Sequence, residues 1–224
     1  MSALQVGWTS IANLALARIS ERQIESIAQE DDLAERIRSF MVECALQVLE
    51  QQDWASATKR VVLPSMPDEP IGNFDSQFQL PNDFVRVIAV VPYEATGSRR
   101  NFDELQEHQT WIAENGKLLV GNRTIFSTGT TESIALVYVG YSETDINRWS
   151  ALLRDAVSCK IAVRLATNVK GGVNLAAQIE AEYERVLNKA RQADVYRQGS
   201  DLHVYNQDDP QERPHVTRVR DLIR

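Results

Sequence analysis

The chain has 224 residues, with 24 basic and 31 acidic side chains and a formal net charge of −7. Hydrophobic residues make up 43% and charged residues 25%, which is ordinary for a globular protein and excludes disorder along the whole chain. The acidic balance argues against binding nucleic acid by neutralising its phosphates, and no apolar run approaches the ~18–20 residues of a membrane span. The two cysteines, Cys44 and Cys159, lie within helical patterns. We therefore expect a soluble protein, made inside a cell, with buried thiols rather than disulfides.

Residues 1–60 carry a helical pattern. After a short first stripe, apolar residues recur at spacings of four, three, four and four, which places them on one helix face. Asp32 is the expected N-cap residue of this second helix, and Glu35 three residues later completes a capping box. The helix is expected to end near Trp54. The second stripe consists of Leu33, Ile37, Phe40, Cys44 and Val48.

Residues 61–144 carry a different pattern, with short runs of β-branched and aromatic residues that predict strands. Turn-forming residues separate the runs, among them Asn115-Gly116. The last run, 133–141, is apolar on both faces, which is typical of a central strand covered on each side. The segment 102–111 fits either a short helix or a loop. The other expected strands are 78–80, 84–91, 117–120 and 124–126.

Residues 145–198 return to a helical pattern. Asp145 is an expected N-cap, and the helix that follows is apolar around much of its circumference, so it should be the most buried one. Residues 20–53 hold 3 basic and 9 acidic groups, whereas 145–198 hold 9 basic and 6 acidic groups, so these helical segments have opposite charge. Residues 199–224 show no dominant period and predict an extended arm. The expected fold class is α+β: a helical bundle formed by the N- and C-terminal segments, a central and mostly antiparallel β-domain, and an extended C-terminal arm.

Motifs for catalysis or metal binding are not found in the sequence. HExxH, CxxC, GxSxG and the Walker phosphate loop are all missing. His203, Asp208, Asp209 and His215 are suitable ligand types for a metal, but an Asp pair before Pro210 is more typical of a turn. Trp111, Trp149 and Tyr138 could stack nucleic-acid bases, although packing in the core is the commoner use of such residues. We expect no catalytic residues, no metal and no cofactor.

Several stretches in a fixed order carry a resemblance to a known family. They are residues 13–19 with 24–27, a tryptophan that closes a helix in 53–57, the LPxDFxR pattern from Leu80 to Arg86, the strand 135–139 that runs into Thr144-Asp145, and the final helix 177–194. In this order they resemble the head-to-tail adaptor of short-tailed bacteriophages, the tail tubular protein A family. The resemblance covers about residues 8–198. Ser20-Glu21-Arg22 departs from the glycine-containing turn common in the family, and the stretch 93–116 is hard to align.

The resemblance implies a structural protein of the virion and not an enzyme. In that family, copies form a dodecameric ring between the portal protein and the tail nozzle protein, and double-stranded DNA passes through the channel without sequence preference. The helical part builds the ring wall and the β part projects toward the tail. The implied location is the head–tail junction of the virion, after synthesis in the host cytoplasm and with no membrane partner. The implied domain ranges are 1–60 and 145–198 for the helical domain, 61–144 for the β-rich domain and 199–224 for the arm.

The arm is the predicted docking segment. A segment that becomes ordered only on binding can adapt to an imperfectly fitting surface, here the portal or a neighbouring copy. Apolar anchors and arginines would make the contacts. The candidate docking residues are Leu202, Val204, Tyr205, Val216, Arg218, Val219, Arg220, Leu222, Ile223 and Arg224.

Two other functions remain open from the sequence. One is a head-completion connector of a long-tailed phage, although the β segment of roughly eighty residues and the LPxDF stretch favour the short-tail adaptor. The other is a tail-associated glycan-degrading enzyme, which would need two carboxylates flanking a cleft. Glu104, Glu107 and Glu114 are the nominees for that role.

Overall fold

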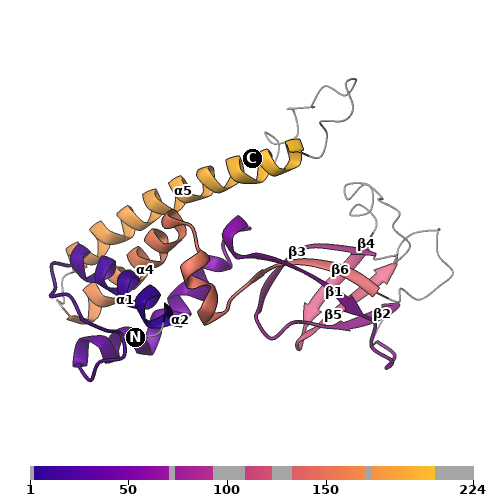
Figure 1. The fold of residues 1–224 in the computed structure, drawn as a ribbon, viewed down its shortest axis with the longest axis horizontal. Coiled ribbons are helices and arrows are strands. Elements are labelled where there is room, and N and C mark those ends of the chain that lie inside the picture. Colours follow the sequence, from indigo (N-terminus) through magenta and orange to yellow (C-terminus); the bar gives the residue numbers. More distant parts are fainter. Residues whose placement is uncertain (1–2, 71–73, 93–108, 123–132, 170–172, 205–224) are drawn as a thin grey trace.

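The computed structural model describes residues 3–70, 74–92, 109–122, 133–169 and 173–204 (Figure 1). These residues form helices at both ends of the described chain and strands between them, so the expected α+β class is confirmed. The helices are α1 (Ala3–Arg18), α2 (Asp32–Leu49), α4 (Ala151–Val169) and α5 (Val173–Val204), with short 3₁₀ turns η1 (Ala55–Ala57) and η2 (Glu143–Arg148). The strands are β1 (Thr58–Pro64), β2 (Ser76–Gln79), β3 (Phe84–Pro92), β4 (Gln109–Glu114), β5 (Lys117–Asn122) and β6 (Ser133–Gly140).

Helix α4 lies at the centre of the helical unit, which comprises α1, α2, α4 and α5. It contacts each of the other three helices, and its residues Val157, Ile161 and Leu165 are completely buried. This agrees with the apolar circumference predicted for the segment after Asp145. The opposite charges of the two helical segments also meet within one subunit, where Arg164 of α4 forms an ion pair of 2.6 Å with Glu43 of α2.

Polar side chains fasten α1 at two points. Asn13 donates its Nδ2 proton to the carbonyl of Ile24 at 3.0 Å and accepts from the Ile24 amide at 2.9 Å, so the turn after α1 is held against the helix. Arg18 joins three helices, because its guanidinium lies 2.5 Å from Asp155 of α4 and 3.2 Å from Glu182 of α5. Both residues belong to the first stretch of the family resemblance, and both act there as structural ties.

The strands form two three-stranded antiparallel sheets, with orders β1-β6-β3 and β2-β5-β4. Strand β6 is central in its sheet, as its two apolar faces predict. The β4–β5 hairpin closes through a two-residue turn in which Asn115 and Gly116 have φ of 50° and 73°. Positive φ at both positions is the type I′ geometry that an Asn-Gly pair predicts.

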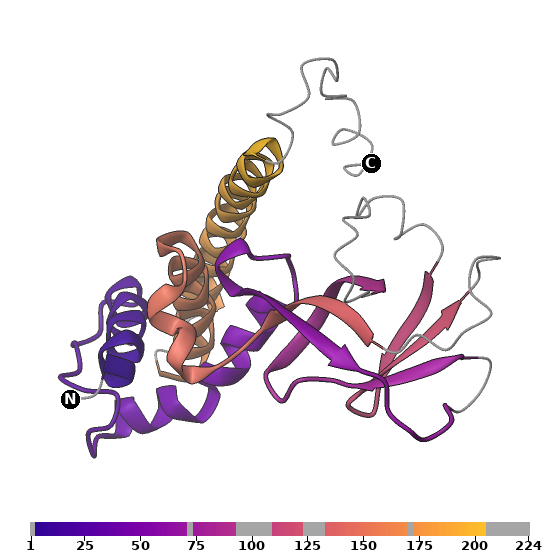
Figure 2. The same ribbon diagram turned by 45° about the vertical axis from the view of Figure 1, so that its right-hand side comes forward.

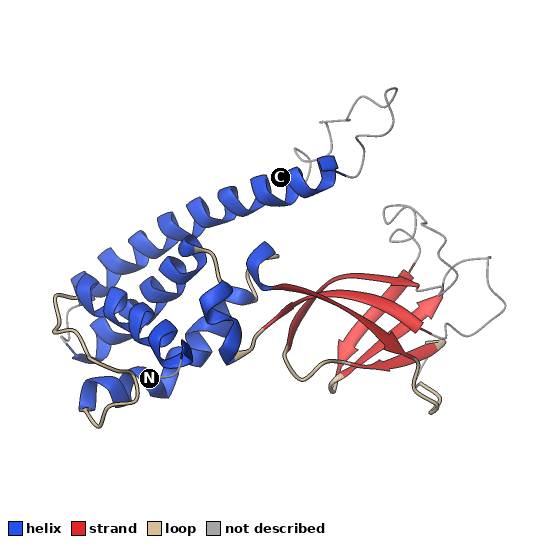
Figure 3. Ribbon diagram, viewed as in Figure 1, coloured by secondary structure: helices blue, strands red, loops and turns tan. Residues whose placement is uncertain are grey.

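Two hydrophobic cores result, one in each unit. The β core packs between the two sheets and includes Phe78, Leu118 and Leu136. The helical core extends into the near end of the first sheet, because Val139 of β6 belongs to it and Val85 and Ile88 of β3 pack against it. Figure 3 shows the helices at one side and the strands at the other, and Figure 2 shows the same separation after a turn. The two units are therefore joined by continuous packing as well as by the chain.

Three predictions about the helix ends and the strands differ from the structure. The N-cap of α2 is Asp31, one residue before Asp32, because Asp31 has the extended backbone of a cap and its carbonyl accepts from Glu35. Strand β1 begins at Thr58, within the range 1–60 assigned to helices. Trp111 lies in strand β4, not in a helix or loop. The expected strand 124–126 lies outside the described residues.

Two further differences concern the C-terminal helices. Asp145 lies in η2 and caps no α-helix, because α4 begins only at Ala151. Ser150, the residue before α4, caps it instead, since its hydroxyl oxygen accepts a hydrogen bond from the amide of Leu153 at 3.2 Å. Helix α5 continues to Val204, so the arm cannot begin at residue 199 as predicted. A single glycine costs a helix about 1 kcal/mol, which is too little for Gly199 to end so long a helix.

Candidate functional site

Residues from four stretches of the family resemblance, far apart in sequence, lie together where the helical unit meets the β unit. The chain crosses between the units twice, through η1 into β1 and from β6 into η2. The turn before β3, which carries the LPxDFxR pattern, lies against both crossings. Helix α5 completes the junction through Asp194.

A charged cluster, here called the junction cluster, consists of Lys59, Asp83, Tyr138 and Asp145. The ammonium of Lys59 on β1 lies 2.6 Å from Asp83 Oδ2 and also forms an ion pair with Asp145 Oδ2 of η2. The hydroxyl of Tyr138 on β6 donates to Asp83 Oδ1 at 3.1 Å. These side chains are largely shielded, with 27%, 28% and 12% of Lys59, Asp83 and Asp145 exposed. One cation thus links both crossings and the turn before β3.

The pKa values of Lys59, Asp83 and Tyr138 are shifted in ways that favour the charged pair of Lys59 and Asp83. Burial acts to raise the pKa of Asp83, but hydrogen bonds from Lys59 and Tyr138 and the charge of Lys59 outweigh it, so the pKa is lowered. Burial acts to lower the pKa of Lys59, but its hydrogen bonds to Asp145 and Asp83 raise the pKa overall. Burial and the hydrogen bond to Asp83 raise the pKa of Tyr138 to about 12. Each group therefore keeps its native protonation state across the neutral range.

The lowered pKa of Asp83 predicts a dependence of stability on acid. A carboxyl whose pKa is lower in the folded chain stabilises it above the unfolded pKa of about 3.9, and this stabilisation is lost as the pH falls through the folded pKa. Asp83→Asn should therefore lower the urea midpoint at pH 7, and the difference from the parent protein should shrink below about pH 4. A difference that stays constant down to pH 3 would contradict this prediction.

Gly140 lies directly beside the junction cluster. A Cβ at this position would lie 2.9 Å from Lys59 Cδ, 3.0 Å from Tyr138 Cε2 and 3.2 Å from Asp83 Oδ2. Because three side chains would have to shift, we expect Gly140→Ala to lower the free energy of unfolding by about 1–3 kcal/mol. Urea unfolding measures the change, with Asn82→Ala in the exposed turn nearby as a control. Equal stabilities of the two variants would contradict the close packing of the cluster.

A second group of contacts fixes the segment between α2 and β1. The indole Nε1 of Trp54 donates to the carbonyl of Val48 at 2.9 Å, and the side chain is completely buried. The amide of Ala55 donates to Asp194 Oδ2 of α5 at 2.7 Å. Asp194 is 3% exposed, so this buried carboxylate ties α5 to the crossing.

Arg86 of β3 makes the third tie. Its guanidinium lies 2.6 Å from a carboxylate oxygen of Asp53 and donates to the carbonyl of Glu50 at 3.2 Å. Asp83 and Arg86 are the two charged residues of the LPxDFxR pattern, and each bonds to a crossing between the units. The carbonyl of Asp83 also accepts from the amide of Tyr141 at 2.7 Å. The pattern therefore has a structural explanation at the junction.

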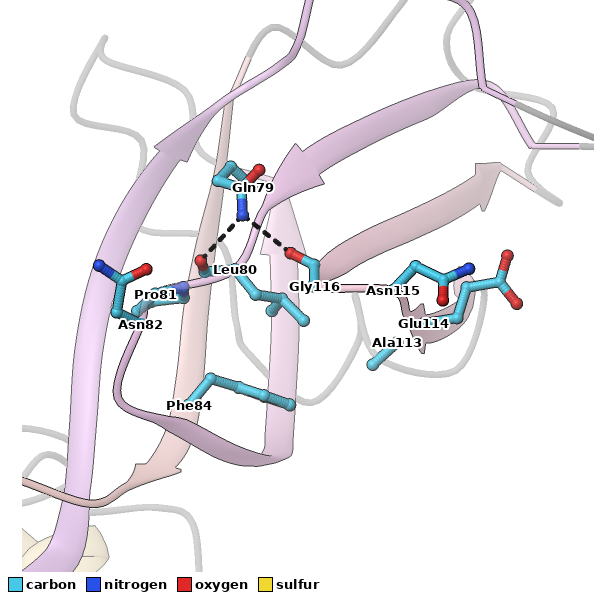
Figure 4. A pocket seen from close by; sticks show the side chains of 9 residues that line it. All are labelled: Gln79, Leu80, Pro81, Asn82, Phe84, Ala113, Glu114, Asn115 and Gly116. Atoms are coloured by element: carbon cyan, nitrogen blue, oxygen red, sulfur yellow. Dashed lines mark hydrogen bonds between the residues drawn. The ribbon is translucent and has the colours of Figure 1, made fainter.

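A pocket lies in the β unit, between the β4–β5 turn and the turn before β3. It has a volume of about 340 Å³. Figure 4 shows Gln79 at its wall, donating from Nε2 to the carbonyls of Leu80 at 3.4 Å and Gly116 at 3.1 Å. Glu114 is the one carboxylate among the residues that line it. The other nominated glutamates, Glu104 and Glu107, lie outside the described residues. The lining residues are Gln79, Leu80, Pro81, Asn82, Phe84, Ala113, Glu114, Asn115 and Gly116.

The other residues considered for function do not come together in the part of the chain that the structure describes. Trp149 is buried in the helical core, Tyr138 in the β core, and Trp111 is 39% exposed on β4, so they form no stacking platform. Among the described residues no three His, Cys, Asp or Glu side chains gather in a way that would hold a metal. None of the described helices is both long and apolar enough to span a membrane.

The predicted docking residues fall mostly beyond the described chain. Leu202 and Val204 lie in the last turns of α5. The remaining predicted docking residues lie outside the described residues. They are Tyr205, Val216, Arg218, Val219, Arg220, Leu222, Ile223 and Arg224, and His215, Asp208 and Asp209 of the considered metal site also lie there.

Sequence reasoning overlooked the junction, although one signal for it was present. The buried face of α5 repeats at Ile179, Tyr183, Leu187 and Ala190, and the next position on this face is Asp194. A carboxylate on an apolar helix face predicts a buried polar contact.

In comparisons with known proteins, neither the protein-family models nor the curated proteins give a match to this chain.

Proposed function

We propose that this chain is a structural protein of the virion, the head-to-tail adaptor of a short-tailed bacteriophage. One observation carries the proposal. The stretches that resemble the family, scattered from Asp53 to Asp194, meet at a single junction and bond to one another there, directly or through Lys59. These contacts give the stretches a shared structural role. That role is to fix a β unit on a helical unit, as a connector between two different partners requires.

In this proposal the copies stand side by side in a ring, most simply a dodecamer. The helical unit forms the ring wall beneath the portal protein, and the β unit faces the tail nozzle protein. The net charge of −7 on each copy is multiplied in the ring. An acidic channel wall repels DNA phosphates and so favours passage of the genome over adhesion to the wall.

The segment after α5 is proposed to dock on the portal or on a neighbouring copy. The segment follows α5, which contacts α4 and η1. The C-terminal end of α5 extends beyond the other helices (Figure 1). Deleting residues 205–224 leaves α5 whole and should abolish binding to portal-bearing heads, while the helical content measured by circular dichroism stays close to that of the full chain. Leu222→Asp with Ile223→Asp, at unchanged length, should weaken binding through the loss of apolar anchors. Full binding by the deletion variant would refute docking through this segment.

A further inference from the structure

The β4–β5 turn places a chemically reactive pair of residues at the surface. Asn115 and Gly116 are both exposed, and their φ angles of 50° and 73° lie in the left-handed region. Asparagine is one of the thermolabile residues. It is especially labile before glycine, because glycine has no side chain to shield its own backbone nitrogen. The backbone around this pair therefore decides whether the pair reacts.

Contacts on two sides hold Gly116 in place. Its carbonyl oxygen accepts from the amide of Leu80 at 3.0 Å. The same oxygen accepts from Nε2 of Gln79 at 3.1 Å (Figure 4). Both donors lie at the end of β2, outside the hairpin, while the pairing of Glu114 with Lys117 closes the turn from its own strands. Gly116 cannot move without breaking the two hydrogen bonds from the end of β2.

The native turn keeps the reacting atoms apart. In the reaction the backbone nitrogen of Gly116 attacks Cγ of Asn115, a cyclic imide forms, and the side-chain nitrogen leaves as ammonia with the proton of the Gly116 amide. Ring closure requires this backbone nitrogen and Cβ of Asn115 on the same side of the Cα–C bond of Asn115. A residue in the left-handed region has a ψ of roughly 30–60°, which puts the two atoms on opposite sides of that bond. The turn must therefore open before the ring can close.

We infer that Asn115 is a site of spontaneous deamidation, gated by opening of the β4–β5 turn, and that Gln79 is a positioning residue that keeps the turn closed. Water then opens the imide at either carbonyl and leaves aspartate or isoaspartate. Both products add a carboxylate beside Glu114, and isoaspartate also adds a methylene group to the backbone of a two-residue turn. The inference is independent of the proposed function.

The rate of deamidation in folded variants tests the role of Gln79. Full-length parent, Gln79→Ala and Gln47→Ala chains are incubated in the same mildly alkaline buffer, and tandem mass spectrometry follows Asn115 in the tryptic peptide that ends at Lys117. Because one exposed hydrogen bond is lost, Gln79→Ala should open more often and react about two- to fivefold faster than the parent. Gln47→Ala loses a glutamine hydrogen bond to Glu43 on α2 and should react at the parent rate. Equal rates in all three chains overturn the role of Gln79.

The unfolded chain gives the rate without the gate. In urea, at the same pH and temperature, Asn115 of the parent should react at least about tenfold faster than in the folded chain, since both ties to Gly116 are gone. Parent and Gln79→Ala should then react equally fast, so a faster folded variant reflects the closed turn and not the local sequence. Circular dichroism before incubation confirms that the variants are folded. A folded parent that reacts as fast as the unfolded chain overturns the inference.

Discussion

Replacing Trp54 with alanine should lower the free energy of unfolding by about 3–5 kcal/mol, because it opens a cavity in a packed core. Trp54 is completely buried, and its Nε1 bonds to the carbonyl of Val48, so the change also leaves a buried carbonyl without its partner. Trp54→Phe, which keeps a ring but removes the donor, should cost less. Urea unfolding monitored by circular dichroism measures both values.

A matched control comes from the β unit. Trp111 is 39% exposed, and Trp111→Ala should change the stability of the isolated chain little. If the two alanine variants were equally stable, Trp54 would not be the anchor that closes α2 at the junction.

Replacing Lys59 with alanine should have the second large effect and lower the free energy of unfolding by about 2–3 kcal/mol. Removing one partner of a fully buried ion pair commonly lowers the free energy of unfolding by more than this. The side chains here are partly exposed, so the expected loss is smaller. The loss arises because Asp83 and Asp145 then face each other without their shared cation. Chemical unfolding gives the magnitude, and limited trypsin digestion should show faster cleavage after Arg60 as the crossing loosens.

The reason for this loss can be tested by removing the charges that Lys59 compensates. Lys59→Ala combined with Asp83→Asn and Asp145→Asn should regain part of the stability, since no uncompensated carboxylate remains. Arg148 also approaches Asp145, at 3.9 Å, but its side chain is 82% exposed, so Arg148→Ala should have little effect. A triple variant less stable than Lys59→Ala alone would show that charge compensation is not the role of Lys59.

The elements predicted well from sequence are those whose signal is local. The spacing in α2 from Leu33 to Val48 places these residues toward one face, and the Asn115-Gly116 pair alone fixes the turn between β4 and β5. Strand β1 was not among the predicted strands, because Lys59 and Arg60 before it and Pro64 at its end leave an apolar run of only residues 61–63. Its first residues become a strand by pairing with β6, as in the register Lys59–Tyr138. That partner is remote in sequence, so no local pattern announces it.

The junction cluster was not predictable for the same reason. Lys59 is 24 residues from Asp83, and the Ala55–Asp194 hydrogen bond spans 139 residues. Ordinary surface ion pairs look the same in a sequence, and only the fold shows that these are shielded. Asp145 illustrates the point, because its position before a helical pattern predicts a cap, whereas the structure uses its carboxylate to bind Lys59.

The central claim is that this polypeptide connects a capsid opening to a tail, with its two units held in fixed orientation. Electron cryomicroscopy of intact particles of the phage proposed to encode it tests this directly. We expect copies of the chain in a closed ring between portal and nozzle, with the helical unit against the portal. Density for this chain in the capsid shell, in the distal tail or nowhere in the particle would contradict the account.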